Sequence, residues 1–132
     1  MIPPVTSATV LVVDDCPAIC DLIEIILGRV GYHVLTATRA PEALRLARHA
    51  TGIDLLISNV EMPEMRGDEL ARRFCMLHPA TPVVFISSFE GRIEVTGQYE
   101  VLPKPFTVAE LRGAVSAALR NRPAPVETAL VA

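Results

Sequence analysis

Short apolar runs alternate with helical segments along most of the chain, and this alternation limits the possible folds more than any other feature. The runs with the length and β-branched content of buried strands are Val10–Val13, Tyr32–Ala37, Asp54–Ser58, Pro82–Ser87 and Tyr99–Leu102. The segments with helical character are Pro17–Val30, Pro41–Ala50, Asp68–Leu77, Phe89–Thr96 and Thr107–Arg120. Strands that alternate with helices form parallel sheets covered on both faces. The sequence therefore predicts an α/β fold, a doubly wound five-stranded parallel sheet flanked by five helices, with helix four short.

Two helix ends carry local signals. Gly31 follows the apolar periodicity of the first helix and predicts that the helix stops there. Thr107 is followed three residues later by Glu110, which is the spacing of a capping box at the start of the last helix.

Length and composition favour a single domain that binds proteins. The 132 residues fit one domain, and a net charge of -3 without a basic run gives little support for nucleic-acid binding through this domain. The chain has no signal segment and no apolar run that could span a bilayer, which predicts a cytoplasmic location and no membrane partner. Three cysteines without zinc-site spacing suit a reducing compartment. We expect an N-terminal extension at 1–9, the domain at 10–121 and a flexible tail at 122–132.

Polar residues stand at or just after the ends of four predicted strands. Asp14 and Asp15 follow the first strand, Asn59 the third and Lys104 the fifth, while Ser87 ends the fourth. In a doubly wound sheet these ends meet where the strand order reverses. Two adjacent carboxylates favour a hard divalent cation such as Mg²⁺, and a lysine with a hydroxyl favours an anion such as a phosphoryl group. The sequence thus predicts an oxygen-rich pocket at this edge.

The chain resembles the receiver domains of two-component response regulators, the chemotaxis regulators among them. The matching segments are Val10–Asp15, Gly31–Ala37, Asp54–Gly67, Pro82–Ser88 and Leu102–Phe106. The resemblance covers nearly all of Val10–Arg120 and implies a flavodoxin-like sheet of receiver topology. It also implies a phosphorelay activity in which a histidine kinase passes a phosphoryl group to one aspartate with Mg²⁺. The implied partners are a histidine kinase or phosphotransfer protein and a downstream output protein, and a homodimer stays open.

The resemblance further implies a role for each pocket residue. Asp14 and Asp15 match the acidic pair that holds Mg²⁺, and the backbone carbonyl of Glu61 falls at a further metal ligand. Ser87 matches the hydroxyl residue that contacts the phosphoryl group, and Lys104 matches the lysine that pairs with it.

Asn59 stands at the position of the phosphoacceptor aspartate, and this is the main departure from the family. A neutral amide is a poor nucleophile, so Asn59 should not form an acyl phosphate. The metal set of Asp14, Asp15, Asn59 and Glu61 also loses one negative charge, so its affinity for Mg²⁺ should fall. Lys104 should then pair with Asp14 or Asp15.

A second departure concerns the readout. The family usually has a switch aromatic three residues before the lysine, where this chain has Val101. Tyr99 lies two residues earlier and, by strand alternation, should point to the same side.

Functions from three classes fit the pattern to different degrees. A receiver domain without catalysis of its own would signal by protein docking, as a natural pseudo-receiver or with Asn59 as an engineered replacement of aspartate. A hydrolase with an aspartate nucleophile would need a motif that the residues around Asp14–Cys16 lack. A flavodoxin-like binder would need a phosphate-cradling loop after the first strand, where Asp14 and Asp15 repel phosphate. The receiver domain is favoured, and no enzyme activity is expected.

Overall fold

A parallel β-sheet forms the centre of the structure, a computed structural model that describes residues 8–88 and 99–121. The strands are β1 (Thr9–Val13), β2 (His33–Ala37), β3 (Leu55–Asn59), β4 (Val83–Ser87) and β5 (Glu100–Pro103). They lie in the order β2-β1-β3-β4-β5, and every neighbouring pair is parallel. The strand order reverses between β1 and β3. Open sheets of this kind place their sites at that boundary, beyond the carboxyl ends of the strands.

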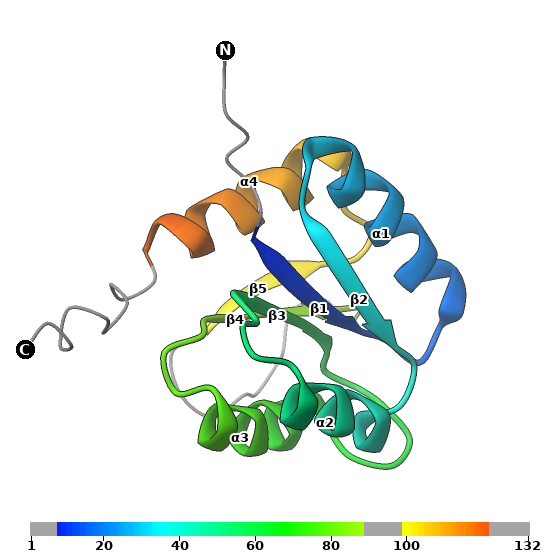
Figure 1. Cartoon of the computed structure of the whole chain (residues 1–132). Helices are drawn as coiled ribbons and strands as arrows, with labels where there is room; N and C mark the ends of the chain where they lie inside the picture. The colour runs from blue at the N-terminus through cyan, green and yellow to red at the C-terminus, as the bar shows by residue number, and fades with distance from the viewer. Residues whose placement is uncertain (1–7, 89–98, 122–132) are drawn as a thin grey trace, which may run out of the picture.

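Helices cover both faces of the sheet (Figure 1). Helices α1 (Pro17–Val30) and α4 (Val108–Arg120) lie on one face, and α2 (Ala40–His49) and α3 (Gly67–Leu77) lie on the other. This arrangement confirms the doubly wound fold of receiver topology, with four helices among the described residues. The predicted short helix Phe89–Thr96 lies outside the described residues, so α4 is the helix predicted over Thr107–Arg120. None of the helices described here has both the length and the apolar content to cross a membrane.

Alternate residues of each strand pack on opposite faces of the sheet, as the two-residue period requires. Leu11 and Leu56 belong to the apolar layer beneath α2 and α3, whereas Val12 and Ile57 belong to the layer beneath α1 and α4. All positions of β3 and β4 are buried, which is typical of central strands in a sheet that is covered twice. Most residues of these two strands are apolar because neither row of side chains faces water, and the polar exceptions, Ser58, Asn59 and Ser87, lie at the carboxyl ends.

The structure confirms both predicted helix ends. Gly31 has φ of 110°, in the left-handed region that favours glycine, and its N–H donates to the carbonyls of Gly28 and Leu27 at the end of α1. At the start of α4, the Thr107 side chain accepts from the Glu110 N–H while the Glu110 carboxylate accepts from the Thr107 N–H. This reciprocal pair is the expected capping box.

Strand β3 ends one residue later than the sequence predicted. Asn59 is its last residue and lies opposite Ile86 of β4, and the next N–H, of Val60, donates to the Ile86 carbonyl at 3.0 Å. The pairing continues past Ser58 because it uses the main chain, which a polar side chain does not disturb. Strand β5 is likewise shifted by one residue, to Glu100–Pro103. The Asn59 side chain is therefore held by a rigid strand end.

Tyr99 and Val101 lie on the same side of the sheet, as the alternation predicted. Both pack against the layer beneath α2 and α3. The Tyr99 ring meets Phe85 edge-on, with ring centroids 5.0 Å apart and planes at 81°. This geometry is favourable for an aromatic pair.

Candidate functional site

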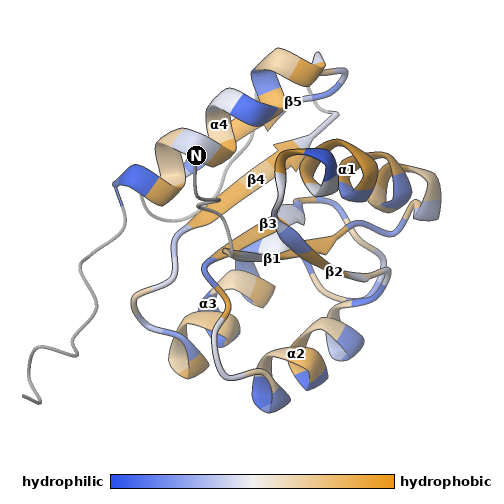
Figure 2. Ribbon diagram, turned by 45° about the horizontal axis from the view of Figure 1, so that its top comes forward, coloured by the Kyte–Doolittle hydropathy of each residue, from blue (hydrophilic) through white to orange (hydrophobic). Residues whose placement is uncertain are grey.

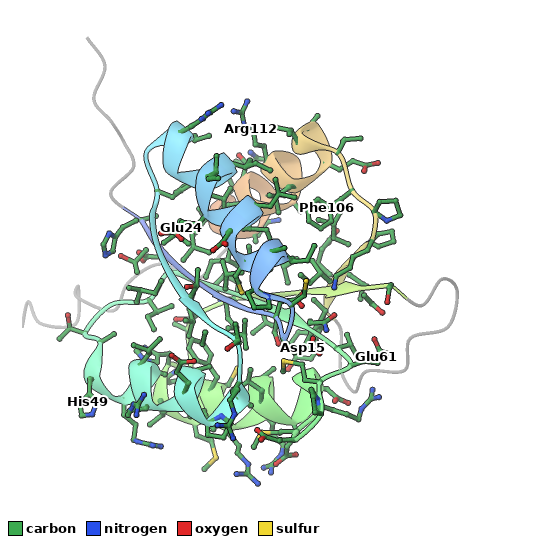
Figure 3. The ribbon with its side chains drawn as sticks, turned by 90° about the vertical axis from the view of Figure 1, so that its right-hand side faces the viewer. Asp15, Glu24, His49, Glu61, Phe106 and Arg112 are labelled. Carbon is green, nitrogen blue, oxygen red and sulfur yellow. The ribbon has the colours of Figure 1, made fainter. Side chains whose placement is uncertain are left out.

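The strand ends bring together the predicted pocket residues at one edge of the sheet. Asp14, Asn59 and Ser87 are buried there, whereas Asp15 is exposed. Figure 3 shows Asp15 and Glu61 at this end of the molecule and His49 at the opposite end. The arrangement follows from the parallel topology, because all strands deliver their carboxyl ends to the same edge.

Asp14 and Lys104 form a largely buried ion pair at this edge of the sheet. Lys104 Nζ lies 2.9 Å from Asp14 Oδ2, and the side chains are 18% and 0% exposed, respectively. The other carboxylate oxygen of Asp14 accepts from the Cys16 N–H at 2.9 Å, and the Lys104 N–H donates to the Ser87 carbonyl at 2.7 Å. The predicted pairing of Lys104 with Asp14 or Asp15 is thus confirmed, and Asp14 is the partner.

Lys104→Met is expected to lower the free energy of unfolding by about 2 kcal/mol, measured by urea denaturation. Removing one member of a fully buried pair costs about 3–5 kcal/mol because it strands the other charge, and the partial exposure of Lys104 reduces that cost. Arg39→Met is the matched control. It removes the exposed pair between Arg39 and Glu64, whose side chains are 62% and 47% exposed, and should leave the free energy of unfolding nearly unchanged because solvent screens the pair. If the two variants lost equal amounts of unfolding free energy, that result would contradict the conclusion that the burial of Asp14 makes its pairing with Lys104 important.

The amide of Asn59 links two segments of the pocket. Its Nδ2 donates to Asp15 Oδ1 at 3.1 Å and to the Glu61 carbonyl at 2.8 Å. Asn59 is 5% exposed, and its Oδ1 has no hydrogen-bond partner among the described residues. Both amide hydrogens are therefore used, while the amide oxygen is not.

Glu61 contributes a second group that sequence reasoning missed. Its carbonyl was predicted to face the pocket, but its carboxylate also accepts a hydrogen bond from Ser87 Oγ at 3.3 Å. The acidic residue two positions after Asn59 was the only available signal, and it does not reveal where the side chain points. A carboxylate beside Ser87 repels an anion, so a phosphoryl group would have to displace the exposed Glu61 side chain.

Cys20 is buried against the main chain at Asp14 and Ala37 and is not a reactive thiol. Its Sγ donates to the carbonyls of Asp14 and Ala37 at 3.5 and 3.6 Å. Burial raises the pKa of Cys20 to about 11, so the thiol stays neutral near pH 7. Cys20 therefore packs as a small apolar side chain.

The relationship to known proteins agrees with this geometry. The family model of the response regulator receiver domain matches residues 10–116. The chain belongs to this family. The receiver is 35% identical over 130 residues to the DNA-binding transcriptional regulator NtrC of Rhizobium meliloti, covering 92% of this chain and 27% of that protein. It is 33% identical over 123 residues to the sensor kinase CckA of Brucella abortus, covering 88% of this chain and 13% of that protein.

Solved receiver structures share the fold over most of the chain. Chemotaxis protein CheY4 of Vibrio cholerae superposes with a TM-score of 0.76 at 30% identity, covering 86% of this chain and 99% of that one. The receiver domain of the hybrid histidine kinase CckA has a TM-score of 0.75 at 36% identity, covering 85% and 99%. The receiver therefore spans nearly all of these solved domains but only 27% and 13% of the two longer relatives above.

Membership of the family confirms the predicted class of signalling domain. Receiver domains belong to two-component systems, interact with histidine kinases and output domains, and generally bind Mg²⁺ at an acidic phosphorylation site.

The pocket as arranged does not fit a divalent cation well. Asp15 and the Glu61 carbonyl offer oxygens of the right chemistry, but both already accept from the Asn59 amide, and Asp14 is paired with Lys104. Within residues 8–88 and 99–121, no group of three Asp, Glu, His or Cys side chains comes together as a metal site. A cation would have to displace the amide hydrogens from two of its ligands.

Proposed function

We propose that this receiver domain signals by docking to protein partners and does not accept a phosphoryl group. The observation that carries the proposal is an amide, Asn59, at the buried end of β3, where the resemblance places the phosphoacceptor carboxylate. An amide oxygen is neutral and the amide nitrogen lone pair is delocalised, so neither atom attacks phosphorus effectively. The domain then has no catalytic step of its own.

The remaining pocket residues keep the roles that the resemblance implies, with altered strength. Asp14, Asp15, Asn59 and the Glu61 carbonyl would be the ligands of Mg²⁺, and Ser87 and Lys104 would contact an anion. We propose that Mg²⁺ binds weakly, because its ligands are engaged by the Asn59 amide and by Lys104. The domain limits 10–121, the cytoplasmic location and a homodimer stay predictions.

An apolar surface beside the pocket supports docking. Ile19, Leu22 and Phe106 line a hollow of about 350 Å³ that also includes Lys104. Leu22 is 45% exposed, and Ile25, one turn further along α1, is 53% exposed. Figure 2 shows α1 as a strongly hydrophobic helix. A partner that reaches the pocket from this side would cover these side chains, and we propose a histidine kinase or phosphotransfer domain as that partner.

The double change Leu22→Asp and Ile25→Asp is expected to weaken this docking by at least about tenfold, which corresponds to about 1.4 kcal/mol. Isothermal titration calorimetry against a panel of isolated histidine phosphotransfer domains measures the effect. The variant should remain folded because both side chains are about half exposed in the free domain.

Met76→Asp is the matched control for this experiment. Met76 is 75% exposed on α3, on the opposite face of the sheet, and its replacement should leave the affinity unchanged. Equal binding by the α1 variant and the unaltered domain would contradict docking through this surface. Failure of the unaltered domain to bind any phosphotransfer domain would contradict the proposed class of partner.

A further inference from the structure

We propose that the Asn59 amide group takes the structural place of a cation in this pocket. The two hydrogen bonds from Asn59 Nδ2, to Asp15 Oδ1 and to the Glu61 carbonyl, are called the amide bridge. The amide bridge holds Asp15 Oδ1 and the Glu61 carbonyl close to each other, which a bound divalent cation would otherwise do. The proposal concerns the internal support of the pocket and holds independently of the docking function.

The geometry of the amide bridge supports this assignment. Asp15 follows β1 and Glu61 follows β3, and Asn59 Nδ2 lies 3.1 and 2.8 Å from their oxygens. An NH₂ group carries two partially positive hydrogens, so it offers one donor to each oxygen. The bridge thereby ties the segment after β1 to the loop after β3 at the strand-order reversal.

Charge in the pocket makes such a donor necessary. Asp15 and the Glu61 carbonyl are both acceptors, and two acceptors held side by side repel each other without a donor or a cation between them. Lys104 does not fill this role, since its Nζ lies 2.9 Å from Asp14 Oδ2. The amide of Asn59 is the group that lies between the two oxygens.

The orientation of the amide follows from its neighbours. The reversed orientation would turn Oδ1 toward Asp15 Oδ1 and the Glu61 carbonyl, placing three acceptors together. The observed orientation avoids that contact and leaves Oδ1 buried without a hydrogen-bond partner among the described residues.

The consequence is a pocket whose shape does not depend on a divalent cation. In Asn59→Asp both donors are lost and a further carboxylate joins those of Asp14, Asp15 and Glu61, so this variant should need a cation to relieve the repulsion. Thermal unfolding with and without Mg²⁺ separates the two situations. The unaltered domain should have the same Tm with and without Mg²⁺. Asn59→Asp should have a lower Tm without Mg²⁺, and Mg²⁺ at about 100 times its dissociation constant for this variant should raise the Tm again.

Two further variants complete the test. Asn59→Ala removes the bridge without adding charge, so its Tm should fall by several degrees and Mg²⁺ should restore it only in part. Asn121→Asp makes the same amide-to-carboxylate change at the exposed end of α4, and its Tm should not respond to Mg²⁺.

A direct readout needs no variant. The side-chain NH₂ signals of Asn59 in an NMR spectrum of the unaltered domain should exchange slowly with solvent and keep their positions when Mg²⁺ is added. The proposal is overturned if Mg²⁺ raises the Tm of the unaltered domain as much as that of Asn59→Asp. It is also overturned if those NH₂ signals exchange as fast as an exposed amide, or if Asn59→Ala is as stable as the unaltered domain.

Discussion

Asn59→Asp is expected to gain one phosphoryl group per chain when incubated with acetyl phosphate and Mg²⁺. The change supplies a charged oxygen nucleophile at the end of β3 and removes the amide hydrogens that now engage Asp15 and the Glu61 carbonyl. Lys104 and Ser87 lie at the same edge, and they can contact the added anion once Lys104 turns from Asp14 and the exposed Glu61 side chain leaves Ser87. Intact-mass spectrometry measures the gain as the mass of one phosphoryl group.

The double variant Asn59→Asp with Lys104→Met is the control for this result. It keeps the nucleophile but loses the cation that would stabilise the anion, so its phosphorylation should be much slower. If the Asn59→Asp variant is folded and gains no phosphoryl mass, that result would contradict the view that Asn59 alone prevents phosphorylation.

Gly67→Ala is expected to cost about 3 kcal/mol of unfolding free energy or more, the largest loss among the stability variants considered. A Cβ at Gly67 would lie 2.1 Å from the Asn59 carbonyl oxygen and 3.0 Å from both Asn59 C and Val60 Cα. These are main-chain atoms at the end of β3, so they have little freedom to move, and overpacking of this kind usually costs 1–3 kcal/mol even against side chains. Urea denaturation measures the loss.

Gly113→Ala is the matched control for Gly67→Ala. Gly113 is exposed on α4, and a Cβ there meets nothing within 4 Å. Because alanine favours the helix, this variant should gain up to about 1 kcal/mol. A loss at Gly67 no larger than the change at Gly113 would contradict the close approach of α3 to β3.

The fold was predictable because central strands that are buried on both faces consist mostly of apolar residues, which are easy to recognise in the sequence. β3 and β4 are buried at every position, and each begins with an apolar run, Leu55–Ile57 in β3 and Val83–Ile86 in β4. The capping box at Thr107 and the glycine at Gly31 were predictable because each depends on residues close in sequence. The end of β3 was misplaced by one residue, since main-chain pairing at Asn59 is indifferent to its polar side chain.

The pocket was predictable in its members but not in its contacts. The parallel topology alone places Asp14, Asn59 and Ser87 at one edge of the sheet, because the carboxyl ends of all strands lie there. Asp14 is buried and forms the ion pair with Lys104, whereas Asp15 is exposed and accepts a hydrogen bond from the Asn59 amide. The sequence does not show which of the two adjacent aspartates has which partner. The partner of each carboxylate depends on the orientation of its side chain, which the sequence does not specify.

The Glu61 carboxylate illustrates the same limit. Its contact with Ser87 joins residues 26 positions apart, across the loop after β3 and the end of β4. Nothing in the local pattern around either residue specifies that pairing. Its effect is to place a negative charge beside the Ser87 hydroxyl, which disfavours the binding of a phosphoryl group there in the unaltered domain.

The measurement that tests the central claim most directly is an NMR titration of the unaltered domain with beryllofluoride and Mg²⁺, observed at the backbone amides of Ser87 and Lys104. Beryllofluoride imitates a phosphoryl group on a carboxylate, so Asn59→Asp serves as the positive control. The account predicts saturable shifts in that variant and none in the unaltered domain. A saturable complex of the unaltered domain, with an affinity equal to that of Asn59→Asp, would contradict the claim that this receiver works without phosphoryl transfer.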